Sequence, residues 1–372
     1  MLASLDRHPH ARSVLASAIE DGRPSHAYLF HGPGGAGKRE VARALAAELL
    51  SEGAADRENS RARVVSGVHP DLTWVVPSGA HEMLVSDIHG PVIAAASRTP
   101  FESRRRVFVI ERVDELGDEA ANRMLKTLEE PASFVHLILL TDRLGEVLPT
   151  IRSRCQLVRF EPPGAEQLAS ELETLGVTGD TARAAVALAL QDSDRARELV
   201  GEDGQALRAA AEHFARAALA ERMAQARPWE KLLAAVRSRG DVAGAELEAQ
   251  EVAELELTSR KDQKRVKGEW ADRGRRTRRR AQTAALDLGL QLVSLWFADL
   301  ACLAWEAEDL VRNSDRRREL REDAACDGGA DSERLRRAME LVEDTRLRFA
   351  LNVSEDLACE ALGYRLEQSL HS

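Results

Sequence analysis

Short apolar runs alternate with helical patterns along residues 28–160 of the chain. The runs are YLF (28–30), LTWVV (72–76), RVFVI (106–110), VHLILL (135–140) and QLVRF (156–160). Short apolar runs bounded by turn residues indicate buried strands, and helices between strands imply parallel pairing. The pattern therefore predicts an α/β domain whose parallel sheet is covered by helices on both faces.

Two segments between these runs carry apolar residues at helical spacing, so we expect helices over residues 38–50 and 119–130. Pro131 ends the second pattern, because proline cannot continue a helix. The apolar positions that share a face are Val41, Leu45 and Leu49 in the first helix, and Met124, Leu125 and Leu128 in the second.

The sequence EPPG at residues 161–164 marks the expected end of the sheet domain, since proline and glycine interrupt regular structure. Beyond it the periodicity is helical throughout. We expect three parts: a sheet domain over residues 1–162, a small helical lid over 163–204 and an all-α domain over 205–372.

The composition suits helices with charged outer faces, because 44% of the 372 residues are hydrophobic, 31% are charged and only 4% are aromatic. The most apolar run, residues 285–305, contains Asp287, Gln291 and Asp299, which are costly in a bilayer. It predicts a buried helix and not a membrane span. The four cysteines form no C-x-x-C pair and the first residues lack the apolar core of a signal peptide, which favours a cytoplasmic location.

The net charge of -10 conceals a local change of sign. A block of five glutamates between residues 246 and 256 is followed by residues 258–280, where eleven Lys or Arg and three Asp or Glu leave +8. One interpretation is a solvated helix or helical hairpin whose charged blocks neutralise each other. The other is a basic patch that contacts DNA phosphates.

The stretch HGPGGAGKRE at residues 31–40 resembles a phosphate-binding loop between a strand and a helix. Its glycines allow backbone N–H groups to converge on phosphates, and its lysine reaches the β- and γ-phosphates. The predicted phosphate-binding residues are Gly32, Gly34, Gly35, Gly37 and Lys38.

Two parts of the hydrolytic machinery are altered. Arg39 stands where a Ser or Thr hydroxyl would bind Mg²⁺. The strand RVFVI continues with Glu111 and Arg112, so a cation occupies the position that would activate water. Asp114 and Glu115 come later and are interpreted as helix-cap or surface acids. The sequence therefore predicts a site that does not hydrolyse nucleotide.

Four stretches together resemble the bacterial clamp-loader proteins of DNA polymerase III, within the AAA+ class. They are residues 26–38, 68–75, 99–131 and 148–160, and the most specific motifs are LKTLEEP and Ser153-Arg154-Cys155. The resemblance implies an AAA+ sheet domain, a helical lid and a helical collar that joins subunits. Because the motor subunits of this family keep an intact loop and an Asp-Glu strand end, Arg39, Glu111 and Arg112 imply a non-hydrolysing subunit.

The same resemblance implies that Arg154, flanked by Ser153 and Cys155, acts as an arginine finger on a neighbouring ATPase subunit. Arg152 is a competing candidate for this role. The alternative is that Arg154 merely pairs with Glu129 or Glu130 at the surface.

The implied partners are the motor subunits (gamma/tau), the delta subunit, the sliding clamp and, through the assembly, primed DNA. The chain would be a component of DNA polymerase III holoenzyme, a DNA-directed DNA polymerase and nucleotidyltransferase, without ATPase or polymerase activity of its own. A clamp-loader-type ATPase with Glu111 as the active acid is the main alternative.

No cofactor is expected to be required, although weak ATP or ADP binding without hydrolysis is compatible with the loop. We expect no metal site and no zinc, because residues 51–68 contain no cysteine where family members usually carry a four-cysteine module. The family's nucleotide-sensing arginine of the lid corresponds to Arg195 or Arg197.

Overall fold

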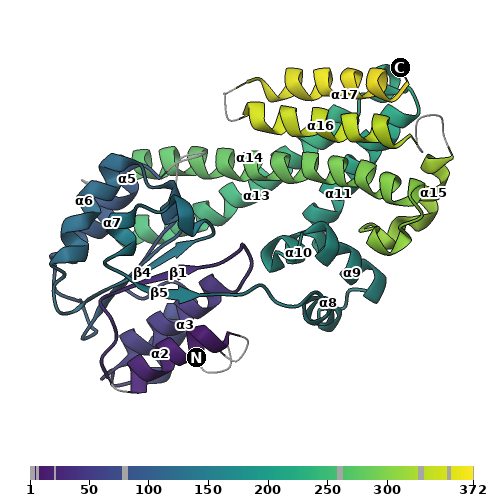
Figure 1. The fold of residues 1–372 in the computed structure, drawn as a ribbon. Coiled ribbons are helices and arrows are strands. Elements are labelled where there is room, and N and C mark those ends of the chain that lie inside the picture. The colour runs from purple at the N-terminus through teal and green to yellow at the C-terminus, as the bar shows by residue number, and fades with distance from the viewer. Residues whose placement is uncertain are drawn as a thin grey trace. The chain divides into compact units, whose positions relative to one another are not determined.

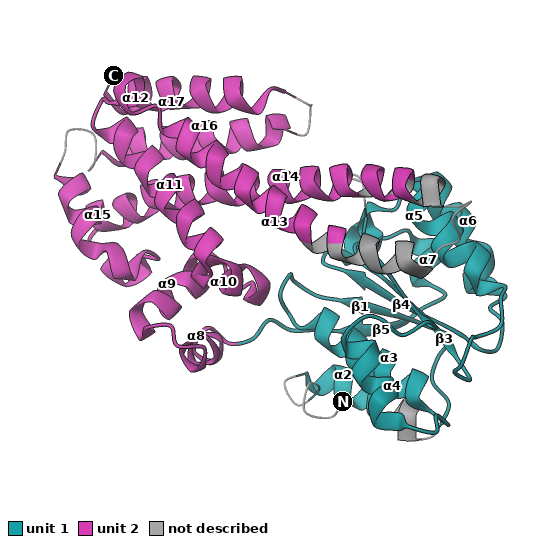
Figure 2. Ribbon diagram, turned by 180° about the vertical axis from the view of Figure 1, so that it is seen from behind, with its two compact units in different colours: residues 1–163 teal, residues 164–372 magenta. Residues whose placement is uncertain are grey.

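The computed structural model describes residues 5, 8–20, 22–77, 83–257, 263–325, 331–349 and 353–371. It divides into two compact units, Met1–Pro163 and Gly164–Ser372, which Figure 2 distinguishes by colour. The division lies beside the first expected boundary, after residue 162. The further division into lid and collar stays a prediction, because one hydrophobic core runs through the second unit from Leu168 to Leu370.

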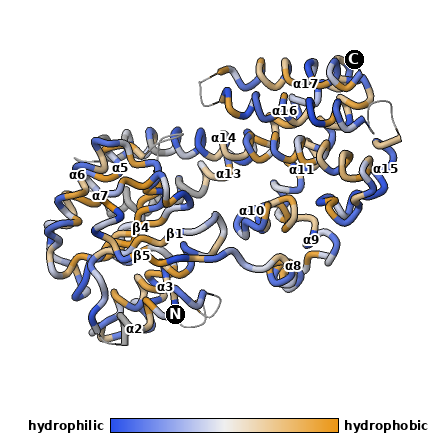
Figure 3. Tube along the Cα trace, viewed as in Figure 1, coloured by the Kyte–Doolittle hydropathy of each residue, from blue (hydrophilic) through white to orange (hydrophobic). Residues whose placement is uncertain are grey.

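In the described part of the first unit, five parallel strands form a sheet of order β2-β3-β4-β1-β5. The strands are β1 (Ala27–His31), β2 (Leu72–Val75), β3 (Arg106–Ile110), β4 (Val135–Thr141) and β5 (Gln156–Arg159). Each coincides with one of the apolar runs in the sequence. The α/β class of this unit is therefore confirmed, and Figure 3 shows these strands among the hydrophobic segments of the chain.

Helices cover both faces of this sheet (Figure 1). One face packs on α2 and α3, and the other on the short α5 and η1 together with α6 and α7. The helical elements of the unit are α2 (Pro9–Glu20), α3 (Lys38–Ser51), α4 (Arg57–Val65), α5 (Val85–Ile88), the π-helical η1 (His89–Ala94), η2 (Val113–Glu115), α6 (Asp118–Glu129), η3 (Leu144–Glu146) and α7 (Pro149–Arg152).

Side-chain alternation along each strand builds the two cores of this unit. In β1, Tyr28 and Phe30 enter the core beneath α3, whereas Leu29 enters the core beneath α6. In β3, Val107 enters the core beneath α3 and Phe108 enters the core beneath α6. Both faces of the central strands are therefore apolar, which explains why they appear in the sequence as continuous hydrophobic runs.

Every regular element in the described part of the second unit is a helix. Its elements are α8 (Ala165–Thr174), α9 (Gly179–Leu188), α10 (Ser193–Val200), α11 (Glu202–Leu219), α12 (Met223–Ala226), α13 (Pro228–Leu257), α14 (Gln263–Ala304), η4 (Glu308–Leu310), η5 (Ser314–Arg316), α15 (Arg317–Ala324), α16 (Ser332–Arg348) and α17 (Glu355–His371). The helical C-terminal region predicted from the sequence is therefore confirmed.

The apolar run of residues 285–305 forms, except for its last residue, the C-terminal half of α14. By length and composition, residues 270–304 are apolar enough to cross a membrane, but 61% of the apolar window is buried inside the unit. Its polar interruptions are satisfied there. Asp287 accepts a hydrogen bond from Arg346, and Gln291 accepts one from Arg195. Asp299 accepts hydrogen bonds from the backbone N–H groups of residues 312 and 313. The prediction of a buried helix is confirmed.

The helices α13 and α14 run antiparallel, and some of their described charged side chains pair with each other. Arg278 lies 3.3 Å from an Asp241 oxygen and 3.8 Å from a Glu248 oxygen on α13. Arg279 pairs with Glu355 of α17 at 2.7 Å, and Arg275 pairs with Asp272. These contacts favour the interpretation of mutually neutralising helices. Residues 258–262 of the basic segment lie outside the described residues.

Candidate functional site

The phosphate-binding loop connects β1 to α3, where the sequence predicts it. Gly37 precedes the helix with φ 78°, a left-handed conformation that glycine adopts without strain. Gly32 has φ 147°, and a Cβ atom there would lie 2.2 Å from the carbonyl oxygen of Phe160. Two of the predicted glycines are therefore required by the backbone itself, and the loop is held closely against the end of β5.

Lys38, the first residue of α3, folds back over the loop with a side chain that is only 7% exposed. Its Nζ donates to the carbonyl oxygens of Gly32 at 2.6 Å and Pro33 at 2.5 Å. It also lies 2.8 Å from Oδ1 of Asp142, which follows β4. Since an ammonium group has three donors, these contacts engage each of them. Sequence reasoning missed Asp142, although its position after VHLILLT placed it at the same sheet edge as the loop.

Arg39 of the loop and Glu111 of the altered strand end contact each other. Arg39 donates from Nε at 2.8 Å and from Nη2 at 2.5 Å to Oε2 of Glu111. The other carboxylate oxygen, Oε1, accepts a hydrogen bond of 2.7 Å from the indole of Trp74. The Glu111 side chain is 6% exposed and that of Arg39 is 59% exposed.

This arrangement does not fit Mg²⁺. Arg39 offers no oxygen ligand, and both oxygens of Glu111 already accept hydrogen bonds from protein donors. A guanidinium group therefore takes the place beside the carboxylate that a cation would occupy. Trp74 was not identified from the sequence, because nothing in the run LTWVV indicates which face its indole lies on.

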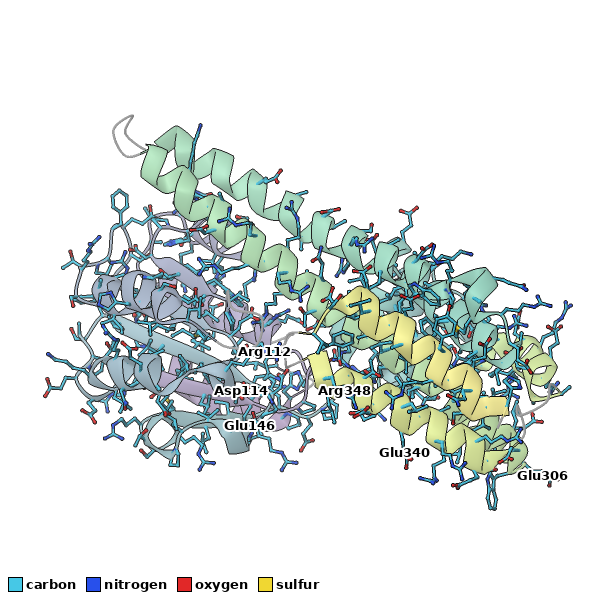
Figure 4. All side chains as sticks on the ribbon, turned by 90° about the horizontal axis from the view of Figure 1, so that it is seen from above. Arg112, Asp114, Glu146, Glu306, Glu340 and Arg348 are labelled. Atoms are coloured by element: carbon cyan, nitrogen blue, oxygen red, sulfur yellow. The ribbon has the colours of Figure 1, made fainter. Side chains whose placement is uncertain are left out.

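The interpretation of Asp114 and Glu115 as cap or surface acids is wrong, because their side chains are 1% and 5% exposed. Asp114 accepts hydrogen bonds from Thr141 at 2.7 Å and from Arg143 at 3.1 Å. Glu115 pairs with Arg112 at 2.6 Å. Arg112 has φ 53° and therefore turns the chain directly after β3, which brings the acids of η2 back under the strand ends. Figure 4 shows Arg112, Asp114 and Glu146 at one end of the unit.

Arg154 lies between α7 and β5 with a side chain 34% exposed. Its Nη2 pairs with Oε1 of Glu129, the last residue of α6, at 2.6 Å. Its Nη1 donates to the carbonyl oxygen of Thr150 at 2.8 Å and to the hydroxyl of Ser153 at 3.2 Å. The surface pair that the sequence left open as an alternative is therefore present.

The two neighbours of Arg154 support its position. Cys155 packs against the core beneath α6 and α7, and burial raises the pKa of its thiol to about 12. A thiol with that pKa is not a nucleophile at neutral pH. The hydroxyl of Ser153 donates to the carbonyl oxygen of Thr150 and so continues the turn of α7. Arg152, the competing candidate, reaches the carbonyl oxygen of Leu144 at 3.5 Å.

The segment expected to lack zinc contains α4, whose Asp56 caps the backbone N–H of Asn59. Among the described residues, no group of three or more His, Cys, Asp or Glu is arranged to hold a metal ion. The absence of zinc stays a prediction. Nearby, the fully buried Asp71 accepts hydrogen bonds from the backbone N–H groups of residues 101, 102 and 103, which fixes the loop before β3.

The two candidate sensor arginines belong to α10. Arg195 donates to Gln291 of α14 at 3.0 Å, whereas Arg197 lies 3.5 Å from Glu171 of α8. Both are engaged within their own unit, so the choice between them stays open.

Residues 7–164 match the family model described as "DNA polymerase III, delta subunit". The chain is 38% identical over 162 residues to DNA polymerase III subunit delta' of Bacillus subtilis, covering 41% of this chain and 47% of that protein. It is 32% identical over 174 residues to subunit tau of Escherichia coli, covering 44% of this chain and 26% of that protein. The chain thus spans about half the length of the delta' relative.

A solved structure of a gamma subunit-related protein from Thermotoga maritima covers 97% of this chain and is itself covered fully, at 14% identity and a TM-score of 0.44. The family-model match, residues 7–164, covers the unit that contains the phosphate loop, the Arg39–Glu111 pair and Arg154. This N-terminal unit is therefore similar in sequence to DNA polymerase III subunits, including subunits named delta'.

Proposed function

We propose that the chain is a non-hydrolysing, delta prime-type subunit of a clamp loader and that it supplies Arg154 as an arginine finger to a neighbouring ATPase subunit. The observation that carries the first part is the contact of Arg39 with Glu111. In a hydrolysing site, a hydroxyl and an acidic strand end hold Mg²⁺ and orient water. In this chain the residues at the corresponding positions, Arg39 and Glu111, form an ion pair with each other.

The loop itself retains the features that bind phosphate. Gly32 and Gly37 keep their special backbone conformations, and Lys38 precedes the rest of α3, whose N-terminus favours anions. Weak binding of ADP or ATP is therefore part of the proposal, with Gly32, Gly34, Gly35, Gly37 and Lys38 holding the phosphates. No hydrolytic step follows from this, because the place of the metal is taken by a guanidinium group.

The arginine finger is proposed for Arg154 because it is the partly exposed cation of the Ser-Arg-Cys motif. A guanidinium presented to a γ-phosphate stabilises the charge that develops during phosphoryl transfer, with effects of ~10³ to 10⁵ in rate. Thr150 and Ser153 hold one end of the guanidinium group, while Glu129 neutralises the other. Arg154 would exchange Glu129 for the phosphate of the neighbouring subunit.

The partners follow from the relatives. The match to tau supports assembly with gamma/tau-type subunits, and we extend the proposal to the delta subunit, the sliding clamp and primed DNA. The helices of the second unit would form the collar that joins this chain to them. Replication machinery of this kind operates in the cytoplasm, which is the proposed location.

The first test measures phosphate release by the isolated chain with ATP and Mg²⁺, with and without primed DNA. We expect no turnover above background. Turnover that disappears in Lys38→Ala would show that this chain is itself the ATPase, which is the competing function.

The second test reconstitutes the chain with gamma/tau-type motor subunits whose other sites have been disabled. Arg154→Ala should leave assembly intact while hydrolysis at the site next to this chain falls by at least ~10³. Arg152→Ala tests the competing candidate and should leave hydrolysis unchanged, since Arg152 contacts a backbone carbonyl of its own unit. Unchanged hydrolysis in Arg154→Ala rules out the finger.

A further inference from the structure

The ammonium group of Lys38 already has an anion beside it. Asp142 lies 2.8 Å from Nζ, and two loop carbonyls occupy the remaining donors. In a loop that holds nucleotide, the same ammonium faces the β- and γ-phosphates. The carboxylate of Asp142 therefore neutralises the positive charge of Lys38, which a phosphate group would otherwise neutralise.

We propose that Asp142 is an internal counter-ion that competes with phosphate for Lys38, so that the loop is a weak, metal-independent site for diphosphates such as ADP. This inference rests on the proposed function, because it concerns the same non-hydrolysing loop. In this proposal Asp142, a residue outside the glycine-rich motif, determines how tightly the loop binds a diphosphate.

Burial determines which partner of this ion pair moves. The Lys38 side chain is 7% exposed and is held by two carbonyls, whereas the Asp142 side chain is 49% exposed. Asp142 can therefore turn into water at little cost, since an exposed carboxylate is well solvated. An arriving diphosphate would replace Asp142 at Lys38 while the lysine itself stays in place.

The Arg39–Glu111 pair makes this binding independent of metal. A diphosphate normally brings Mg²⁺, which needs oxygen ligands from the protein. Glu111 directs one oxygen to Arg39 and the other to Trp74, so neither is available to a metal ion without breaking a hydrogen bond. The exposed Arg39 guanidinium also supplies a fixed positive charge on the first turn of α3.

The experiment is calorimetric titration of the full chain with ADP, in excess Mg²⁺ and in excess EDTA. Asp142→Asn should bind ADP about tenfold more tightly than the unaltered chain, a change of ~1.4 kcal/mol. Affinities in Mg²⁺ and in EDTA should agree within about threefold. Lys38→Ala in the Asp142→Asn background should abolish the gain. Asp142→Ser provides a second variant if Asp142→Asn folds poorly.

Glu146→Gln is the matched control, because Glu146 belongs to the same loop after β4 but pairs with Arg143 at 2.8 Å and not with Lys38. Its ADP affinity should equal that of the unaltered chain. The proposal is overturned if neither Asp142 variant gains affinity, if the gain survives Lys38→Ala, or if Mg²⁺ tightens binding more than about tenfold. Each of these outcomes leaves the absence of hydrolysis untouched, since phosphate release is measured separately.

Discussion

Arg39 and Glu111 are 72 residues apart in sequence, and the guanidinium group of one lies 2.5 Å from the carboxylate of the other. Arg39 stands where a phosphate-binding loop usually has Ser or Thr, and Glu111 directly follows β3. Together they form an ion pair at the place where a hydrolysing site would hold Mg²⁺. The two changes therefore stabilise one another, which makes reversal of either one alone unfavourable.

Arg39→Ala should lower the free energy of unfolding by about 1 kcal/mol, because the buried Glu111 carboxylate keeps Trp74 but loses its charged partner. The exposure of Arg39 keeps the effect well below that of a fully buried pair. Urea denaturation measures it. Arg57→Ala is the control, since Arg57 lies 3.9 Å from its carboxylate on Glu48 and should have a smaller effect. Equal effects of the two substitutions would contradict the role given to the pair.

Glu129→Gln should free Arg154 from its own subunit. If Arg154 acts on a neighbouring site, hydrolysis there should be maintained or increased in the reconstituted assembly, because the competing carboxylate has been neutralised. Glu130→Gln, one residue along and exposed, should leave hydrolysis unchanged. A fall in hydrolysis with Glu129→Gln would instead show that Glu129 is needed to position Arg154.

The arginines of α14 should contribute little to DNA binding. Replacement of residues 275, 276, 278, 279 and 280 by Gln should change the salt dependence of DNA binding by less than ~0.9 in slope, the value of a single phosphate contact. The same variant should unfold at a lower temperature, since Arg278 and Arg279 lose their carboxylate partners. A slope reduced by several such contacts would restore the interpretation as a DNA-binding patch.

Asp299 predicts a pH dependence of stability in the second unit. Burial raises its pKa from the ordinary value of an aspartate, although the backbone N–H groups of residues 312 and 313 and the Asn313 amide oppose the shift. The folded chain therefore binds this proton at a higher pH than the unfolded chain does. The stability that the group contributes is fully present below its unfolded pKa and is lost as the pH rises through its folded pKa.

Asp299→Asn cannot titrate, so the stability difference between the unaltered chain and the variant should be larger near pH ~4 than near pH ~7. Urea denaturation at the two pH values measures it. Asp309→Asn, an exposed acid of the following turn, should show no such change with pH. A difference that shrinks on acidification would contradict the sign of the shift.

The strands could be predicted from sequence because both faces of the sheet are covered, which makes each strand a continuous apolar run. The helix α4 could not be predicted, because its sequence RENSRARVV buries only Ser60 and Val64 and shows no clear apolar face. The positions of Gly32, Gly37 and Lys38 were predicted because the motif is local.

Contacts across the sheet edge could not be predicted in this way. The sequence shows Arg39 in place of a Ser or Thr and Glu111 after the third apolar run, but their pairing depends on β1 and β3 lying two strands apart in the sheet. The burial of Asp114 and Glu115 depends on the left-handed conformation of Arg112. Nothing in the sequence there indicates this conformation, because the stretch has no glycine at that position. The Arg154–Glu129 pair was left as an alternative because α6 and α7 are not adjacent in sequence.

The close approach of α13 and α14 also couples the lengths of the two helices. Gly240 and Gly244 lie one turn apart on α13, where a Cβ atom would lie 2.5 Å from Gln282 and 2.7 Å from Arg278, one turn apart on α14. One residue added to α13 between them would turn the later glycine by about 100° around the helix axis. Homologues that vary here should therefore gain or lose residues in matched numbers on both helices, and a deletion on one should be accompanied by a deletion on the other.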